Sequence, residues 1–283
     1  MEKKTKMMFV FLCVQVIHCP AFANTWSIET VSEIKSLVGS CVVLPCTFDY
    51  EGHDVASFKM SGSWHTEAKD PEYIYHTDIK KIILSFHGRT KLVGKVGERN
   101  CSLEIDKVSV KDKGPYCFRI EITGKGVEIP EKDNYSFKEK YVTMALKGEP
   151  EKPMLTYTQF AHAGSAYSVT CSVRHSCPTN HPTLSWDRTD GETIVHYKDI
   201  GQGNWEVSSV LTFTPLASDH NTRLTCSAQF FKLNNPQESS ITLNVKSEGG
   251  AVGVLSIAIP VAAVVVIAII LVGLYKWKIS RLN

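Results

Sequence analysis

The stretch that decides the fold is Gly114-Pro-Tyr-Cys-Phe-Arg-Ile-Glu121, with Asp112 two residues before it. It almost matches Asp-x-Gly-x-Tyr-x-Cys, a pattern of two-sheet β-sandwiches in which a corner tyrosine lies two residues before a core cysteine. Here the cysteine comes one residue early, so that Phe118 occupies the core position. Because side chains alternate between the two faces of a strand, we expect Phe118 to point into the core, and Cys117 and Arg119 to point to the outer face.

The chain around this stretch contains short β-rich runs with turn signals and no sustained helical period. A polar linker with two prolines, Lys147–Pro153, divides it into two halves. The second half carries Cys171, Trp186 and Cys226, which form the Cys…Trp…Cys framework of an immunoglobulin sandwich. The expected strands are Cys41–Phe48, Ile79–Phe86, Cys101–Val108, Tyr116–Ile122, Val169–Val173, Thr183–Trp186, Val207–Thr214 and Arg223–Phe230. We therefore predict an all-β fold of two immunoglobulin-like sandwiches in series, V-set over residues 24–147 and C2-set-like over residues 148–246.

The two ends of the chain predict a membrane-anchored surface protein. Residues 1–23 combine basic residues, an apolar run and Ala21-Phe-Ala23, which together are typical of a cleaved signal peptide. Residues 251–275 carry no charged side chain and exceed the roughly 20 residues that span a bilayer, so we expect one transmembrane α-helix. Basic residues follow within 276–283, which the positive-inside rule assigns to a short cytoplasmic tail. The expected location is the plasma membrane, as a single-pass type I protein with an extracellular ectodomain.

Composition and motifs exclude several classes of function. The net charge is only +2, with acidic and basic residues interleaved, so we expect no nucleic-acid partner. No nucleophile, carboxylate-pair or phosphate-loop motif is found, and we expect neither an enzyme nor a cofactor. Cys171, His175, Cys177 and His181 have a spacing that superficially suits a metal, but disulfide pairing explains the cysteines better in an oxidising compartment. We expect no metal.

The cysteines of the first half give one expected bridge. Nine cysteines less the two in the signal peptide leave seven, most of which should pair. If Cys117 points outward, Cys46 cannot reach it without a shift in register, and Cys101 is its best partner. A Cys46–Cys117 bond remains the alternative, because connectivity does not follow from sequence alone.

Two further bridges follow from the same alternation. Cys41 lies an odd number of residues before Cys46, so it faces away from its own core, and Cys177 in the second half is an available partner. Cys171–Cys226 then closes the second sandwich. Cys117 is left over on the outer face as a free thiol, a capped thiol or an intermolecular bridge, and we favour the unpaired state.

Six motifs follow one another along both halves of the chain. They are Gly-Ser-Cys-Val-Val-Leu-Pro-Cys at 39–46, Phe-His-Gly-Arg-Thr-Lys-Leu-Val-Gly at 86–94, Arg-Asn-Cys-Ser-Leu at 99–103, Tyr-Cys-Phe-Arg-Ile-Glu at 116–121, Cys-Ser-Val-Arg-His-Ser-Cys-Pro at 171–178 and Asp-His-Asn-Thr-Arg-Leu-Thr-Cys at 219–226. In this order they resemble one family, the Siglecs, which are sialic-acid-binding immunoglobulin-type lectins. The resemblance covers nearly the whole ectodomain and implies one bridge within a sheet and another between the first two domains, in agreement with the alternation of side chains.

The resemblance implies a cell-surface lectin that binds terminal sialic acid of glycoproteins or glycolipids and acts in cell adhesion. Arg119 stands at the family's outward arginine, whose planar fork donates two charge-assisted hydrogen bonds to the sialic acid carboxylate. Trp26 stands where the family places an aromatic ring against the N-acetyl methyl group. Tyr135 and Ser136 stand at the strand that contacts the glycerol side chain, while alternation puts Phe137 in the core.

Other features complete the expectations. Asn100-Cys-Ser and Asn134-Tyr-Ser are glycosylation sequons. The resemblance implies a glycan on Asn100, and Asn134 is a second candidate, although a glycan there would crowd the expected site. Trp64 is expected in the core. The tail has no tyrosine motif and residues 251–275 have no basic side chain, so signalling would need a separate partner or clustering. The alternative function is an adhesion molecule that binds a protein counter-receptor with Arg119 idle.

Overall fold

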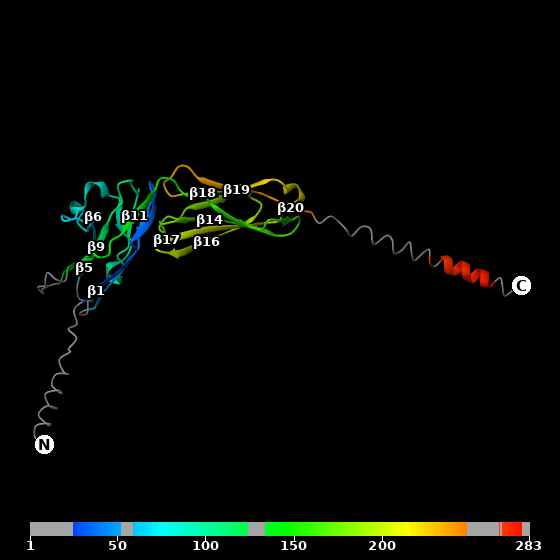
Figure 1. Ribbon diagram of the computed structural model, residues 1–283, viewed down its shortest axis with the longest axis horizontal. Coiled ribbons are helices and arrows are strands. Elements are labelled where there is room, and N and C mark those ends of the chain that lie inside the picture. Colours follow the sequence, from blue (N-terminus) through cyan, green and yellow to red (C-terminus); the bar gives the residue numbers. More distant parts are fainter. Residues whose placement is uncertain (1–24, 52–58, 124–133, 248–265, 267, 279–283) are drawn as a thin grey trace, which may run out of the picture.

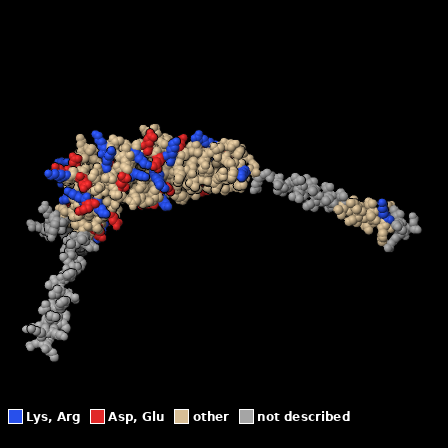
Figure 2. Space-filling model, viewed as in Figure 1, with Lys and Arg blue, Asp and Glu red and all other residues tan. Residues whose placement is uncertain are grey.

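In a computed structural model, the chain is described over residues 25–51, 59–123, 134–247, 266 and 268–278. Two β-sandwiches lie end to end and give an elongated body, and a helical segment lies beyond the second sandwich near the C-terminus (Figure 1). Acidic and basic side chains are interleaved over the first sandwich, whereas the visible face of the second sandwich carries few charges at its far end (Figure 2).

The first sandwich contains a sheet of order β10-β9-β5-β6, together with the strand sets β1-β4 and β3-β8-β7 and the parallel pair β11-β2. The strands are β1 (Thr25–Thr30), β2 (Glu33–Leu37), β3 (Val42–Leu44), β4 (Cys46–Glu51), β5 (Lys59–Thr66), β6 (Tyr73–Tyr75), β7 (Thr90–Leu92), β8 (Leu103–Ile105), β9 (Tyr116–Thr123), β10 (Tyr135–Ser136) and β11 (Thr143–Lys147).

The core of the first sandwich is built on aromatic rings. Phe118 is fully buried, and its ring centroid lies 5.5 Å from that of Phe48, 5.8 Å from that of Trp64 and 6.2 Å from that of Phe137. Trp64 also donates a hydrogen bond from Nε1 to the carbonyl of Cys101 at 3.0 Å. The predictions that Phe118, Trp64 and Phe137 lie in the core are confirmed.

The second sandwich pairs a sheet of order β12-β14-β17-β16 with a sheet of order β15-β18-β19, and β13 pairs with β20. Trp186 donates from Nε1 to the buried hydroxyl of Ser209 at 3.0 Å, so the tryptophan of the Cys…Trp…Cys framework joins the two sheets. The strands are β12 (Met154–Tyr157), β13 (Ala161–His162), β14 (Tyr167–His175), β15 (Thr183–Trp186), β16 (Glu192–Gly201), β17 (Asn204–Phe213), β18 (Arg223–Gln229), β19 (Gln237–Thr242) and β20 (Val245–Lys246).

One expectation about the strands is wrong. The run expected as a strand over Ile79–Phe86 instead forms two 3-10 turns, Ile79–Lys81 and Leu84–Phe86. The carboxylate of Asp78 accepts a hydrogen bond from the N–H of Lys80, which caps the first turn, and Phe86 is the buried residue of the second.

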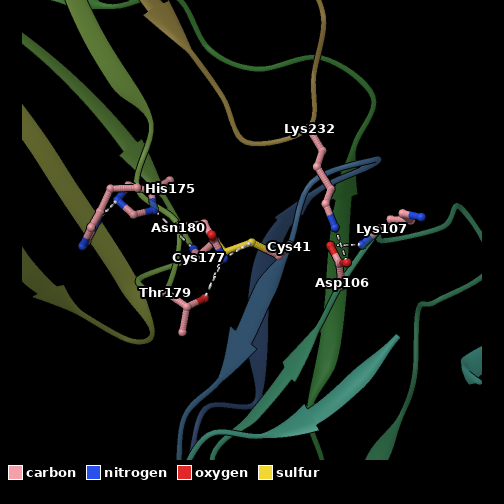
Figure 3. The surroundings of a disulfide bond; sticks show 9 residues. Cys41, Asp106, Lys107, His175, Cys177, Thr179, Asn180 and Lys232 are labelled. Atoms are coloured by element: carbon pink, nitrogen blue, oxygen red, sulfur yellow. Dashed lines mark hydrogen bonds and ion pairs between the residues drawn. A yellow bond between two sulfur atoms is a disulfide. The ribbon is translucent and has the colours of Figure 1, made fainter. Parts of the chain in front are cut away.

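The structure contains three disulfide bonds, Cys41–Cys177, Cys46–Cys101 and Cys171–Cys226, which are the same pairs that the sequence predicts. The first of them joins the two sandwiches (Figure 3). Beside it, the N–H of Val43 donates to the carbonyl of Ser176 at 2.8 Å, and Lys232 forms an ion pair with Asp106 across the same junction. A covalent bond, a backbone hydrogen bond and an ion pair therefore connect the two sandwiches.

The predicted signal peptide, residues 1–23, lies outside the described residues, as does much of the predicted transmembrane segment, residues 251–275. Residues 268–278 are helical. Within the described ranges, no helix is both long enough and apolar enough to cross a membrane.

Candidate functional site

Arg119 lies on β9, on the face opposite to Phe118, and its side chain is 29% exposed. Its Nε donates to Oε1 of Glu121 at 3.1 Å, two residues along the same face. Its Nη1 donates to the hydroxyl of Ser136 at 3.2 Å, and Ser136 is the residue of β10 directly opposite Arg119. The strand register thus fixes the guanidinium between a carboxylate on its own strand and a hydroxyl on the neighbouring strand.

Part of the Arg119 fork is left for a ligand. A guanidinium has five N–H donors, and the contacts to Glu121 and Ser136 use two of them, so three remain. Within the described part of the chain, Nη2 has no hydrogen-bond acceptor. Nη2 and the second hydrogen of Nη1 form the edge of the fork that suits a carboxylate in bidentate geometry.

A chain of hydrogen bonds holds Ser136 in place. His65 on β5 is buried, and its Nδ1 lies 2.8 Å from the carbonyl of Thr66, so Nδ1 carries the proton and Nε2 is an acceptor. Nε2 lies 3.3 Å from the Ser136 hydroxyl, which can therefore donate to His65 while it accepts from Arg119. Burial lowers the pKa of His65, and the nearby charges of Lys138 and Arg119 lower it further, so the ring stays neutral as this chain requires.

The two predicted aromatic residues lie together. Trp26 on β1 and Tyr135 on β10 have parallel rings, with an angle of 9° between their planes and 6.1 Å between their centroids. Trp26 also lies 4.3 Å from the ring of Tyr50 and 6.1 Å from the ring of Phe137. Both Trp26 and Tyr135 are half-buried against the core of the first sandwich, so they form an aromatic edge to the sheet.

The four predicted ligand residues thus form two pairs that meet at β10. Ser136 contacts Arg119 on the outer face, whereas Tyr135 contacts Trp26 on the side of the core. Because Tyr135 and Ser136 are adjacent residues of one strand, their side chains point to opposite faces. The aromatic pair and the arginine are therefore neighbours around the edge of the sheet.

Cys117 is the free cysteine of the described residues, so the favoured prediction of an unpaired Cys117 agrees with the structure, but its side chain is fully buried. Alternation does turn it away from the core, and it lies opposite the buried His65 on β5. Burial, with help from the charges of Glu67 and Glu139, raises the pKa of the thiol to about 11. A side chain covered in this way is unsuited to an intermolecular bridge.

Two residues of the site, Glu121 and His65, were not predicted from the sequence. Glu121 lies two residues after Arg119, and this spacing, which places both side chains on one face of a strand, would have been sufficient to predict it. His65 could not be found in this way, because its contact with Ser136 depends on the order of three strands.

Both sequon asparagines use their side chains locally. Oδ1 of Asn100 accepts from the N–H of Ser102, and Oδ1 of Asn134 accepts from the N–H of Ile122, each at 3.0 Å.

A separate cleft of about 420 Å³ lies between the two sandwiches, and Arg119 does not line it. The candidate site is therefore separate from this cleft.

Comparison with known proteins first defines the class. Residues 149–237 match the CD80-like C2-set immunoglobulin domain family. The described part of the chain thus contains two immunoglobulin-like sandwiches in series, V-set then C2-set.

Comparison with individual proteins narrows the class. The chain is 28% identical to the myelin-associated glycoprotein of Rattus norvegicus, over 78% of this chain and 34% of that one. It is 30% identical to the sialic acid-binding Ig-like lectin 12 of Mus musculus, over 73% of this chain and 43% of that one. Over most of its length the chain is thus similar to Siglec-like proteins of the immunoglobulin superfamily. The chain spans about a third of the length of the first of these relatives.

Among solved structures, the ectodomain of mouse nectin-like molecule 4 matches with 17% identity and a TM-score of 0.35, over 76% of this chain and 67% of that one. A TM-score of this size carries no argument about the site.

Proposed function

We propose that the chain is a cell-surface lectin that binds the terminal sialic acid of glycoproteins or glycolipids and thereby mediates cell adhesion. The observation that carries this proposal is the fork of Arg119, which is partly exposed and, among the described residues, leaves three of its N–H donors unused. Sialic acid is ionised at neutral pH, and a rigid planar fork binds a carboxylate through two parallel hydrogen bonds. The relatives named as sialic acid-binding lectins support the same assignment.

The other residues of the site have distinct roles in this proposal. Ser136 and His65 hold the guanidinium on the side of β10. The ring pair of Trp26 and Tyr135 offers an apolar edge to the N-acetyl methyl group and to the carbon skeleton of the glycerol side chain, since an amphipathic ring suits an apolar patch of a sugar. Glu121 is the counterion that Arg119 keeps when no glycan is bound.

The proposed topology places this site outside the cell. Residues 1–23 are the signal peptide, residues 24–147 the sialic-acid-binding V-type domain, residues 148–246 the C2-type domain, residues 251–275 the transmembrane helix and residues 276–283 the cytoplasmic tail. The chain is then a single-pass type I protein of the plasma membrane, with a glycan on Asn100.

The test replaces Arg119 on cells that display the full chain. One exposed monosaccharide should bind with a dissociation constant of about 1 mM, or about −4 kcal/mol, and a charge-assisted hydrogen bond contributes about 1.5–3 kcal/mol. Arg119→Ala should therefore abolish binding to sialylated target cells, and Arg119→Lys should weaken it severely because a lysine offers no fork. Arg174→Ala is the matched control, since it removes an arginine paired with Glu206 on the second sandwich and should leave binding intact.

Glu121→Gln sharpens the test. The carboxylate of Glu121 lies against Arg119 and repels an incoming carboxylate, so its removal should preserve or strengthen binding, whereas a variant that merely disturbed the strand would weaken it.

The alternative is an adhesion molecule that binds a protein counter-receptor with Arg119 idle, and the ion pair to Glu121 favours it. Sialidase treatment of the target cells separates the two functions. If binding survives both sialidase treatment and Arg119→Ala, with normal surface display of the variant, the proposed lectin function is wrong.

A further inference from the structure

The second sandwich presents an unusual edge. β16 is a strand of 10 residues, every one of them exposed, and it lies at the end of the sheet order β12-β14-β17-β16. One of its edges pairs with β17, and the other pairs with nothing in the described part of the chain. An edge strand offers a row of unpaired backbone N–H and C=O groups to another strand.

The side chains of β16 do not protect this edge. Its exposed apolar residues include Ile194 at 50%, Val195 at 42% and Tyr197 at 56%. Proteins usually block a long edge strand with charged side chains, above all lysine, with a proline, with a β-bulge or with a covering loop. β16 has no proline, its register irregularity lies only at its end, between Asp199 and Gly201, and its charged residues have both signs, so that a second copy can complement them: Glu192, Lys198 and Asp199.

The sequence also leaves this edge without a carbohydrate shield. Both sequons of the mature chain, at Asn100 and Asn134, lie in the first sandwich, and no Asn-x-Ser/Thr sequon occurs in residues 148–246. An N-linked glycan on the second sandwich would be bulky and would block strand addition. The strand is thus long, apolar and accessible.

We propose that β16 is a homophilic interface that pairs, antiparallel, with β16 of a second copy of this chain. The charges select one register. When Val195 lies opposite Val195 of the other copy, Glu192 lies opposite Lys198 twice, once on each side of the twofold axis. Neither Glu192 nor Lys198 forms an ion pair within the described part of its own chain, so both are available.

A register shifted by one position is less favourable in energy. A shift that places Val195 opposite His196 brings Glu192 against Asp199, and like charges that lie directly opposite each other destabilise a sheet. In the proposed register, Thr193 lies opposite Tyr197, a β-branched residue beside an aromatic ring, which is a favourable cross-strand pair.

The register also sets the orientation of the pair. β16 runs along the long axis of the molecule (Figure 1), so antiparallel pairing reverses the long axis of the second copy. The two first sandwiches then lie at opposite ends of the pair. Combined with the membrane span proposed above, this orientation suits copies on two facing membranes. The interface itself does not depend on Arg119 or on sialic acid.

Cysteine cross-linking of the purified full chain in detergent tests the register. Val195→Cys places two thiols opposite each other across the axis, where Cβ atoms lie about 4.5–5.5 Å apart, close to the range that a disulfide bridges. Under a mild oxidant such as copper phenanthroline, this variant should form a dimer on a non-reducing gel. Thr193→Cys is the matched control, because its two copies would be four positions apart, or about 13 Å, and should stay monomeric.

Charge reversal provides an independent check. In the Val195→Cys protein, Glu192→Lys should lower the dimer yield roughly fivefold or more, because two opposite-charge pairs become like-charge pairs. Adding Lys198→Glu should restore the yield, and Arg119→Ala should not change it. Absence of a Val195→Cys dimer, equal cross-linking of both cysteine variants, or failure of the double reversal to restore the yield would each overturn the proposed interface.

Discussion

The two sandwiches can be compared at one buried position of the corresponding strands β9 and β18. In β18 of the second sandwich the buried residue at this position is Cys226, whereas in β9 of the first it is Phe118. The following residue is Ser227 in one and Arg119 in the other. In each sandwich that residue donates a hydrogen bond to the residue opposite it on the next strand, Ser227 to Glu238 at 2.9 Å and Arg119 to Ser136 at 3.2 Å.

The location of the disulfide explains this difference. Cys171 and Cys226 join the two sheets of the second sandwich, with their Cα atoms 6.4 Å apart. Cys46 begins β4 and Cys101 lies two residues before β8, and the two are side by side, with the N–H of Cys101 donating to the carbonyl of Cys46 at 2.9 Å. A bridge between neighbours leaves the inward position of β9 free for a ring. The first sandwich thus joins its sheets by aromatic packing instead of by a covalent bond.

The largest expected effect on stability therefore comes from removing the Phe118 ring. Phe118→Ala should destabilise the first sandwich by about 3–5 kcal/mol, because it opens a cavity among Phe48, Trp64 and Phe137. Amide hydrogen exchange of the full chain is the suitable measurement, since it reports each sandwich separately. The amides of β9 should lose protection while those of β18 keep it.

A second variant tests whether the ring acts through close packing. A Cβ atom on Gly62 would lie 2.7 Å from the Phe118 ring, so Gly62→Ala should also destabilise the first sandwich. Combined with Phe118→Ala, the added methyl group should cost less than it does alone, because the clash is gone. Strictly additive effects would show that Phe118 does not fill this space.

The next effect concerns the disulfides themselves. Both bonds within a sandwich close a chain segment of the same length, with a sequence separation of 55 in each case. The loss of loop-closure entropy in the unfolded chain is then equal, and each bond should contribute about 2–4 kcal/mol. Paired serine substitutions at Cys46 and Cys101, or at Cys171 and Cys226, measured by hydrogen exchange, should lower protection similarly. A much larger loss in one sandwich would assign the difference to packing in the folded state.

Alternation along a strand is the part of this comparison that the sequence could predict. The face of each residue in β9 depends only on its place in the strand, so the inward Phe118 and the outward Arg119 followed from one local pattern. The same parity pointed to Cys101 as the partner of Cys46. These features needed no knowledge of which strands are neighbours.

Features that depend on other elements were not accessible in this way. Cys117 faces away from the core as expected, but it is buried, because residues on other elements, including His65 on β5, cover it. The exposure of β16 depends on the opposite sheet, whose order β15-β18-β19 has no strand to cover it. A pattern in one segment gives the direction of a side chain, and only the assembled sheets give its solvent exposure.

Low pH should destabilise the second sandwich through the imidazole rings of His175 and His181. Nδ1 of His175 accepts from the N–H of Cys177 at 3.2 Å, so Nε2 carries the proton and donates to Nδ1 of His181 at 3.1 Å. A proton on either acceptor would break this chain. Burial, and secondarily the His181 ring, lowers the pKa of His175 to about 4, and burial lowers that of His181. The groups packed against the pair, Tyr197 and Trp205, are aromatic and offer no carboxylate.

The sign of the effect follows from these pKa values. In the unfolded chain an imidazole binds its proton near pH 6.5, whereas folded His175 does so only near 4. The unfolded state therefore binds more protons within this window, and stability present above pH 6.5 is lost as the pH falls toward 4. We expect the melting temperature to fall by a few degrees from pH 7.5 to pH 5, and by less in His175→Asn. Equal losses in both proteins would exclude His175 as the cause.

The smallest effect on stability concerns the residue before the compared position, Cys117 in β9 and Thr225 in β18. Because burial raises the pKa of Cys117 from 9.0 to about 11, its thiolate at pH 8 should be about 100-fold scarcer than that of an unperturbed thiol. Iodoacetamide should therefore leave Cys117 unmodified in the folded chain and label it only after unfolding.

Thr225→Cys is the matched control, since Thr225 is partly exposed and a thiol there should react in the folded state. Cys117→Ser should cost about 1–3 kcal/mol, because it buries a hydroxyl beside His65, whose two ring nitrogens already have partners. Rapid labelling of native Cys117, at the rate of the Thr225→Cys control, would show that the outer face of β9 opens and would restore the possibility of a bridge between two chains.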